Sequence, residues 1–364
     1  MNDPIAATSL ARLTPRQARW VLAAVLLAVL FCVAITLSPI RSGYADGPAR
    51  GHSDIELYRA EIDRMAAGEG YYKVAADELV QRGYPTASVF NWRTPLPMWL
   101  IAQLPSPVLG KALLGLLALS VLLVGFEAVA RGAGAGRAVL TSLLLTGGLL
   151  LCVLGDVYAM PVVWAGVLIA LSLCCYGVNH PRLAVAMGLA AVFCRDLAVP
   201  YGVLCFAMAI RNQRRGEILG WAAGLAAYVL YFGVHAFYVA QARPLVGIAH
   251  VGSWLQLGGA PFVISTAQVN AYLLLLPQWV AAVFLSLALL GVAGWRGEFG
   301  QRVALTLAMY VVAFAFVGHD FNQYWGALIA PLLCFGAAQA PATLSDLWRA
   351  ARGTARASSA VASV

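Results

Sequence analysis

The sequence has 364 residues, of which 61% are hydrophobic and only 11% are charged. Soluble domains carry roughly a quarter of charged residues, so this composition excludes an ordinary soluble domain. The net charge of +8 comes from basic residues spread over the segments between apolar runs. Because no basic face interleaved with aromatic residues is present in the sequence, the charge does not indicate a nucleic-acid partner.

The apolar runs predict an all-α polytopic membrane protein with about ten transmembrane helices. The first run contains an uncharged stretch from Trp20 to Leu37, and no small-residue cleavage site follows it. We therefore interpret it as a retained span rather than a removed signal peptide. The predicted spans are 18–38, 107–130, 138–154, 159–177, 183–194, 197–210, 217–239, 271–294, 302–318 and 323–340.

The predicted spans 183–194 and 197–210 are each too short to cross a bilayer comfortably. Arg195 and Asp196 lie between them, so the pair is either one helix with a buried ion pair or two short helices. A single crossing would place the arginines of 211–215 outside, contrary to the positive-inside rule. We therefore expect two short helices that meet at Arg195 and Asp196.

With the N-terminus inside, the basic residues sort as the positive-inside rule requires. The short outer segments hold Lys111, Arg195 and Arg243, and acidic residues balance the basic ones in the long segment 39–93. This sorting predicts a multi-pass protein of the cytoplasmic (inner) membrane, with its outer loops facing the periplasm or cell exterior. The cytoplasmic segments hold Arg12, Arg16, Arg19, Arg131, Arg137, Arg182, Arg211, Arg214, Arg215, Arg296, Arg302, Arg349, Arg352 and Arg356.

A helix is predicted soon after the first span, where Ser53 and Glu56 form a capping box. Apolar residues then recur at helical spacing from Ile55 to Met65. Asp54 occupies the first helical position, where the positive end of the helix dipole stabilises a carboxylate. A preorganised carboxylate at a membrane surface can act as a general base. The alternative is that Asp54 is an ordinary first-turn acid.

The remainder of the first outer loop, 39–106, is also expected to be folded. A second amphipathic helix is predicted near Val74–Arg82, and a short apolar helix over Leu96–Leu104. The latter is too short to span, so we expect it to lie along the outer leaflet or to dip into it. We interpret 1–348 as a single integral membrane domain that includes this loop, and 349–364 as a short cytoplasmic tail.

Nine polar residues at or near the predicted span ends fall together on the outer side. Ionisable residues at membrane depth are costly and tend to mark function. Arginine binds phosphate through paired charge-assisted hydrogen bonds, and protonated histidine adds a donor, so this group suits a phosphate-bearing substrate. Its members are Asp54, Arg93, Asp156, Tyr158, Arg195, Asp196, His319, Asp320 and Asn322.

Each of these residues also has a purely structural interpretation. Asp156 is compatible with a hairpin turn. Arg195 and Asp196 are compatible with an ion pair that holds two half-helices together. His319 and Asp320 are compatible with a cap on the last helix. The sequence leaves these alternatives open.

No cofactor motif and no metal-ligand spacing is present in the sequence. Walker-type, dinucleotide-binding, His-Glu-x-x-His and Gly-x-Ser-x-Gly patterns are all missing from it. Asp54 and Glu56 lie two residues apart, and such neighbours point in different directions on a helix. We therefore expect no cofactor, and a divalent metal is not favoured.

Two short motifs carry a resemblance to a known family. The first is Ser53-Asp54-Ile55-Glu56-Leu57-Tyr58, followed by Gly68-Glu69-Gly70-Tyr71-Tyr72, then Tyr84-Pro85, Phe90 and Pro95-Leu96-Pro97. The second is Gly318-His319-Asp320-Phe321 before the last span. With the long first outer loop, they resemble the GT-C superfamily of membrane glycosyltransferases. The chain is similar to the bacterial members that use polyprenyl-phosphate-mannose, although it lacks the Asp-x-Asp form that some relatives show.

The resemblance implies an inverting transfer of a single hexose, with mannose expected. The donor would be a polyprenyl-phosphate sugar in the bilayer, and the acceptor an extracytoplasmic lipid or glycan. Asp54 would be the general base, and Arg195 and His319 would hold the donor phosphate with Arg93 behind them. The substrate-binding residues would be Asp156, Tyr158, Asp196, Asp320, Asn322 and Tyr58.

Two other functions remain as alternatives. A transporter or flippase of lipid-linked sugars would be expected to place charges near the bilayer midplane on broken helices of repeated halves. This sequence has one broken pair, its charges cluster outside, and no second half mirrors the first. A ligase or polymerase of lipid-linked glycans is separated poorly from a monosaccharide transferase by sequence.

Overall fold

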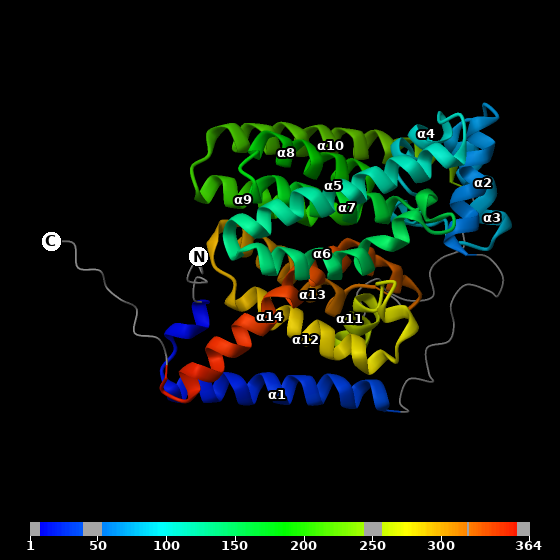
Figure 1. Ribbon diagram of the computed structural model, residues 1–364. Coiled ribbons are helices and arrows are strands. Elements are labelled where there is room, and N and C mark those ends of the chain that lie inside the picture. Colours follow the sequence, from blue (N-terminus) through cyan, green and yellow to red (C-terminus); the bar gives the residue numbers. More distant parts are fainter. Residues whose placement is uncertain (1–7, 39–52, 244–256, 319, 355–364) are drawn as a thin grey trace.

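The computed structural model describes residues 8–38, 53–243, 257–318 and 320–354, and every element in them is a helix (Figure 1). This confirms the predicted all-α class. The α-helices are α1 (Pro15–Leu37), α2 (Asp54–Ala66), α3 (Tyr71–Gln81), α4 (Pro95–Ala102), α5 (Pro107–Ala133), α6 (Ala135–Leu149), α7 (Pro161–Gly177), α8 (Pro181–Cys194), α9 (Val199–Arg211), α10 (Arg215–Ala242), α11 (Gly259–Ala267), α12 (Gln278–Gly294), α13 (Gly297–Phe316) and α14 (Ala330–Ala351).

Several of these helices are long and apolar enough to cross a membrane. Within the described residues there are five, and six if the 3-10 helix Phe321–Leu328 and α14, bent by 63°, form one span. The chain is therefore a helical membrane protein, with fewer full-length spans than the ten expected. The five are α1, α5, Ala135–Val153, α10 and α13.

The difference in span number comes from helix length. α7 has 17 residues and α8 has 14. At 1.5 Å per residue these helices are about 26 and 21 Å long, shorter than the roughly 30 Å of a bilayer core. α12, also of 17 residues, has the same shortfall. α7 and α12 lie within predicted spans, and α8 begins two residues before the span predicted at 183–194. The apolar runs were therefore placed correctly to within two residues.

α8 and α9 fold back on each other at the predicted break. α8 ends at Cys194 and α9 begins at Val199. A Cβ on Gly188 would lie 3.0 Å from the ring of Tyr201 and 2.4 Å from that of Trp221. Residues on the two sides of the break therefore pack together, and the two helices are antiparallel rather than one continuous span.

The first loop contains the predicted short helices at one end of the bundle. α2, α3 and α4 lie together there in Figure 1. Arg64 connects α2 to α3 and to the turn between them. It forms ion pairs with Glu69 at 2.7 Å, Asp77 at 2.9 Å and Glu78 at 3.1 Å. The predicted helices 74–82 and 96–104 correspond to α3 and α4, with ends shifted by a few residues.

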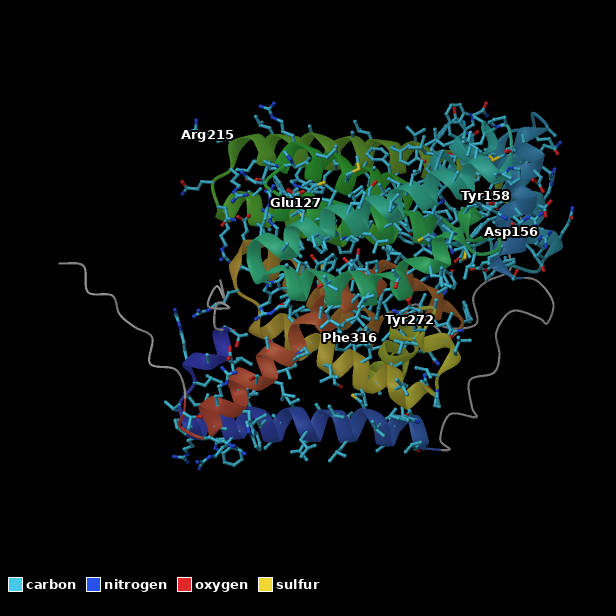
Figure 2. The ribbon with its side chains drawn as sticks, in the orientation of Figure 1. Glu127, Asp156, Tyr158, Arg215, Tyr272 and Phe316 are labelled. Atoms are coloured by element: carbon cyan, nitrogen blue, oxygen red, sulfur yellow. The ribbon has the colours of Figure 1, made fainter. Side chains whose placement is uncertain are left out.

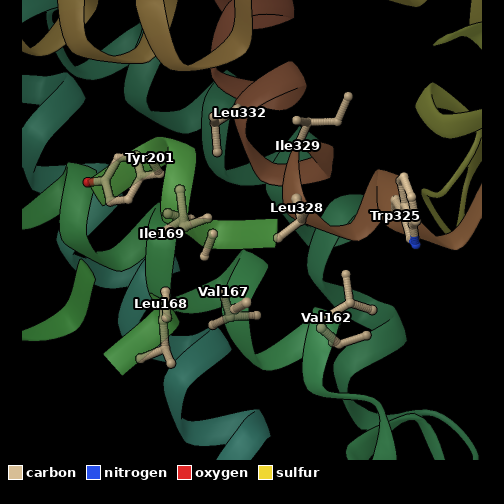
Figure 3. Close-up of a cluster of buried hydrophobic side chains, with 14 of the residues drawn as sticks. Val162, Val167, Leu168, Ile169, Tyr201, Trp325, Leu328, Ile329 and Leu332 are labelled. Atoms are coloured by element: carbon tan, nitrogen blue, oxygen red, sulfur yellow. The ribbon is translucent and has the colours of Figure 1, made fainter. Parts of the chain in front are cut away.

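The core lies around α7, whose side chains are nearly all buried. Figure 3 shows Val162, Val167 and Ile169 of α7 facing Leu328 and Leu332 of the last segment. A Cβ on Gly166 would lie 2.1 Å from the carbonyl oxygen of Ala327, so only glycine permits this approach. Small residues at such contacts let membrane helices pack closely.

The outward faces of the long helices are apolar. On α1, Trp20, Leu26, Leu27 and Phe31 are each at least 60% exposed. Such a continuous surface is unfavourable in water and compatible with lipid chains. It therefore supports the membrane assignment independently of helix length.

The opposite end of the bundle from α2 carries basic residues, with Arg215 at that end and Asp156 and Tyr158 at the other in Figure 2. Arg302 is 1% exposed there, 2.9 Å from Glu298 and with its guanidinium 3.7 Å from the ring centroid of Tyr176. The predicted tail 349–364 begins inside α14, which continues to Ala351, and 355–364 lie outside the described residues.

Candidate functional site

Asp54 occupies the first position of α2, as predicted. The amide of Glu56 donates to Ser53 Oγ at 3.3 Å, and the amide of Ser53 donates to Glu56 Oε2 at 3.4 Å, which confirms the capping box. Asp54 is left outside this exchange. Its Oδ1 accepts a hydrogen bond of 2.8 Å from the hydroxyl of Tyr84.

Tyr84 is a neutral donor to the Asp54 carboxylate. Burial, and then the neighbouring charge of Asp54, raise the pKa of Tyr84 above its usual range. The phenol therefore keeps its proton and fixes the orientation of the carboxylate. Tyr324, from the 3-10 helix Asp320–Leu328, also lies beside Asp54.

The buried face of α2 continues the site along the helix. Asp54, Tyr58 and Glu61 are spaced by four and three residues, so they lie on one face. Tyr58 is 3% exposed and Glu61 is 2% exposed. Arg59 and Asp63, which are exposed, lie on the other side of the helix.

Arg93 is held against this face. Its Nε donates to Tyr58 Oη at 2.8 Å, and its Nη1 donates to the carbonyl of Phe90 at 2.9 Å. The hydroxyl of Tyr71 donates to the backbone carbonyl of Arg93. Burial would lower the pKa of Arg93, but Tyr58, Tyr324, Asp196 and Asp54 raise it well above its usual value. The guanidinium is therefore a fixed positive charge.

Arg195 reaches the same place from the α8–α9 break. Its side chain is 4% exposed, and its Nε lies 3.2 Å from Asp196 Oδ1. Burial raises the pKa of Tyr58 strongly, while the charges of Arg93 and Arg195 oppose that rise. The structure thus brings together five predicted residues: Asp54, Tyr58, Arg93, Arg195 and Asp196.

Several buried polar atoms around this cluster have no hydrogen-bond partner among the described residues. They include Glu61 Oε2 and the hydroxyl of Tyr228, which lies near Arg195 and Asp196. Buried polar groups are nearly always satisfied in native proteins, so such a concentration calls for a partner. A polar, anionic ligand between α2 and the α8–α9 break would supply one.

Asp156 and Tyr158 lie at the same end of the bundle but have other contacts. Asp156 is 2.6 Å from Arg59 and 3.2 Å from Lys111. Tyr158 is 3% exposed and lies under the Lys111 ammonium at 5.7 Å. Because Arg59 lies away from the buried face of α2, these contacts favour the turn interpretation of Asp156.

The late motif is described only in part. His319 lies outside the described residues, and nothing is assigned to the side chain of Asp320. Asn322 is 3% exposed at the start of the 3-10 helix that carries Tyr324. In the described part of the chain, no three His, Cys, Asp or Glu side chains are close enough to hold a metal ion.

Two cavities are lined by residues that contact the cluster, one by Tyr71 and the other by Tyr324. A cleft of about 460 Å³ lies behind Tyr71, between α2, α3, α4 and α10, and a pocket of about 130 Å³ has Tyr324 in its wall. The cleft is lined by Met65, Gly68, Glu69, Gly70, Tyr71, Pro95, Leu96, Trp99, Gln103 and Tyr231. Most of its lining is apolar, which suits a hydrocarbon chain more than a soluble metabolite.

Comparison with protein-family models, curated proteins and solved structures finds no match. Four residues of the site were not predicted as site residues from the sequence: Glu61, Tyr84, Tyr228 and Tyr324, although Tyr84 belongs to the first motif of the resemblance. Glu61 was accessible to the same periodicity argument as Tyr58, since both lie on the Asp54 face of α2. The other three residues reach the site through contacts between segments far apart in the sequence, which no local pattern predicts.

Proposed function

We propose that the protein is a membrane glycosyltransferase that moves a single hexose, expected to be mannose, from a polyprenyl-phosphate sugar to an extracytoplasmic lipid or glycan acceptor. One observation carries the proposal. The carboxylate of Asp54 and the guanidinium groups of Arg93 and Arg195 gather at one end of an apolar helical bundle. This combination supplies a base and an anion site at a membrane surface. The resemblance to GT-C enzymes supports the same assignment.

Asp54 is assigned as the general base of the transfer. It would take the proton of the acceptor hydroxyl, whose oxygen then attacks the anomeric carbon from the face opposite the lipid phosphate. The bond to the phosphate breaks and the centre is inverted. Tyr84, donating to Asp54 Oδ1 at 2.8 Å, would keep the carboxylate in one orientation through this step.

Arg93 and Arg195 are assigned to the donor phosphate, with His319 as a further candidate. The leaving group is already an anionic phosphate, so the protein needs to stabilise its developing charge more than to protonate it. Arg93 is held by Tyr58 and Phe90 before any ligand arrives. Asp196, Asp320 and Asn322 remain candidates for contacts with the sugar, while Asp156 and Tyr158 receive no role in the transfer step.

The apolar chain of the donor would leave the site through the cleft behind Tyr71. Leu96 and Trp99 of α4 line that cleft, and Trp99 and Leu100 are each 50% exposed. A polyprenyl chain in this cleft would lie against Tyr71, whose hydroxyl donates to the backbone carbonyl of Arg93. In this proposal α2, α3 and α4 face the periplasm or cell exterior. The shorter apolar helices complete about ten spans.

A transfer assay with purified protein tests the proposal. Radiolabelled polyprenyl-phosphate mannose and a membrane lipid extract as acceptor should yield one labelled product in which a single hexose is added. Movement of the donor across vesicles without any transfer would contradict the proposal and favour the flippase alternative. Transfer of a preassembled oligosaccharide but not of mannose would favour the ligase alternative.

A further inference from the structure

Glu61 is a buried acid that the proposed transfer step does not use. Its side chain is 2% exposed, and its Oε2 has no hydrogen-bond partner among the described residues. It lies one helical turn beyond Tyr58 on the face of α2 that meets Arg93. An unsatisfied carboxyl in this position is costly, so its retention needs an explanation.

The charged groups that face Glu61 come from several segments. They are Glu78 on α3, Arg82 directly after α3, Arg93 before α4, and Asp54 on α2 itself. The hydroxyl of Tyr71, at the start of α3, also interacts with Glu61. Glu78 is already paired with Arg64 at 3.1 Å and with Arg82 at 3.1 Å.

Arg93 differs from Arg64 and Arg82, which both pair with Glu78. Its hydrogen bonds among the described residues go to a phenol oxygen and a backbone carbonyl, and none goes to a carboxylate. Arg93 is therefore the cation whose charge Glu61 would compensate if it ionised.

We infer that Glu61 competes with the substrate phosphate for the positive charge of Arg93. Protonated, Glu61 leaves the guanidinium charge available to an anionic ligand. Ionised, it takes that charge for itself. This inference rests on the proposed function, because it treats Arg93 as part of the donor-phosphate site.

The electrostatics of the pocket give the direction of this competition. Burial raises the pKa of Glu61 from 4.5 to about 8, against the opposing effect of Arg93, so the acid is mostly neutral at pH 7. A phosphate next to Arg93 would add negative charge and disfavour ionisation of Glu61 further. Binding of the phosphate and ionisation of Glu61 therefore oppose each other, and by linkage each weakens the other.

Binding of farnesyl phosphate to the full-length protein in detergent, measured from pH 6.5 to 9.5, tests the inference. Because the phosphate monoester itself loses a second proton near about pH 6, the quantity compared is the ratio of Glu61→Gln affinity to wild-type affinity. We expect this ratio to be constant below about pH 8 and to rise by up to about tenfold per pH unit above it. Glu61→Gln should keep its affinity at pH 9.5, because the amide cannot ionise. Asp63→Asn, on the exposed side of the same helix, should follow the wild type.

An unchanged fall of affinity above pH 8 in Glu61→Gln would overturn the inference. The protonation of Glu61 is measured separately by the infrared band of its protonated carboxyl, identified by its loss in Glu61→Gln. That band should be present at pH 6.5 and lost by pH 9.5, and its persistence at pH 9.5 would also overturn the inference. Protein that shows the band and its titration but binds no farnesyl phosphate at any pH would instead contradict the proposed donor. Neither readout requires a transfer assay.

Discussion

Asp54 and Glu56 lie two residues apart at the start of α2, and their contacts separate their roles. Glu56 completes the capping box, whereas Asp54 faces Tyr84 and the arginines. Asp54→Asn keeps the size and polarity of the side chain, so we expect stability to change by only a few tenths of a kcal/mol. Loss of the base should lower the transfer rate by about a hundredfold to ten-thousandfold. Initial rates with radiolabelled donor measure this effect.

Glu56→Gln is the matched control for Asp54→Asn. Glutamine can still complete the capping box, so this variant should remain largely active. An active Asp54→Asn together with an inactive Glu56→Gln would move the base to Glu56. Full activity in both variants would mean that the general base does not lie on α2.

Arg195 provides the second test at this scale. Its guanidinium is nearly fully buried, so a lysine there would lose the paired donors that match a phosphate. We expect Arg195→Lys and Arg195→Ala to weaken farnesyl phosphate binding alike, by roughly 1.5–3 kcal/mol for a charge-assisted contact. Monodisperse, detergent-stable variants are required. Normal binding by both variants would indicate that Arg195 serves only in a structural ion pair with Asp196.

Glu61 links the site to stability. Because its pKa rises from 4.5 to about 8 on folding, the folded chain keeps a proton that the unfolded chain has lost between these values. Stability contributed at this position should therefore fall as pH rises through that window, by up to about 1.4 kcal/mol per pH unit. Glu61→Gln lacks this loss. Its stability relative to the wild type should increase from pH 5 to 8 and then stay constant, as measured by unfolding in detergent.

The sequence predicted part of the site for identifiable reasons. The capping box and the helical period are local, so Asp54 and its helix followed directly from Ser53 and Glu56. Tyr84 and Tyr324 reach Asp54 from 30 and 270 residues away along the chain, and no local pattern reports such packing. Asp156 was correctly placed at the same end of the bundle as Asp54. Its pairing with Arg59 was not predictable, because it depends on which side of α2 faces Asp156.

At the scale of whole helices, the break between α8 and α9 was predictable from charge alone. The arginines of 211–215 would have been misplaced by one continuous helix, and the structure has two antiparallel helices instead. Helix lengths were less predictable. Hydropathy marked α7 and α12 as apolar, yet each ends after 17 residues, because turns and 3-10 segments take up the flanking residues.

At Gly188, α8 packs closely against α10 and α9. A Cβ there would lie 2.4 Å from the indole of Trp221, so we expect Gly188→Ala to destabilise the protein by about 1–3 kcal/mol through overpacking. Gly233→Ala is the control, since a Cβ at Gly233 has no heavy atom within 4 Å. That change should be neutral or slightly stabilising. Equal unfolding temperatures for the two variants would contradict the role assigned to Gly188.

The whole molecule is polar at both ends in different ways. The end with α2 gathers arginines around a carboxylate and unsatisfied polar atoms, which suits a ligand. At the other end the charges compensate each other, as where Arg302 lies 2.9 Å from Glu298 and Arg214 pairs with Glu217 at 3.1 Å. This asymmetry favours one functional face, with the opposite end stabilising the bundle and setting its orientation.

Orientation in the membrane is tested by labelling single cysteines with a membrane-impermeant maleimide. Gln103 follows α4 and Asn212 lies in the turn between α9 and α10, and both are exposed. We expect Gln103→Cys to be labelled in intact cells and Asn212→Cys only after permeabilisation. The reason is that α8 and α9 fold back on each other and return the arginines of 211–215 to the side that carries Arg182. Labelling of both positions in intact cells would mean that 181–211 crosses the bilayer once. Labelling of Asn212→Cys alone would mean that the orientation is the reverse of the proposed one. Asp54 would then face the cytoplasm, where no extracytoplasmic acceptor could reach it.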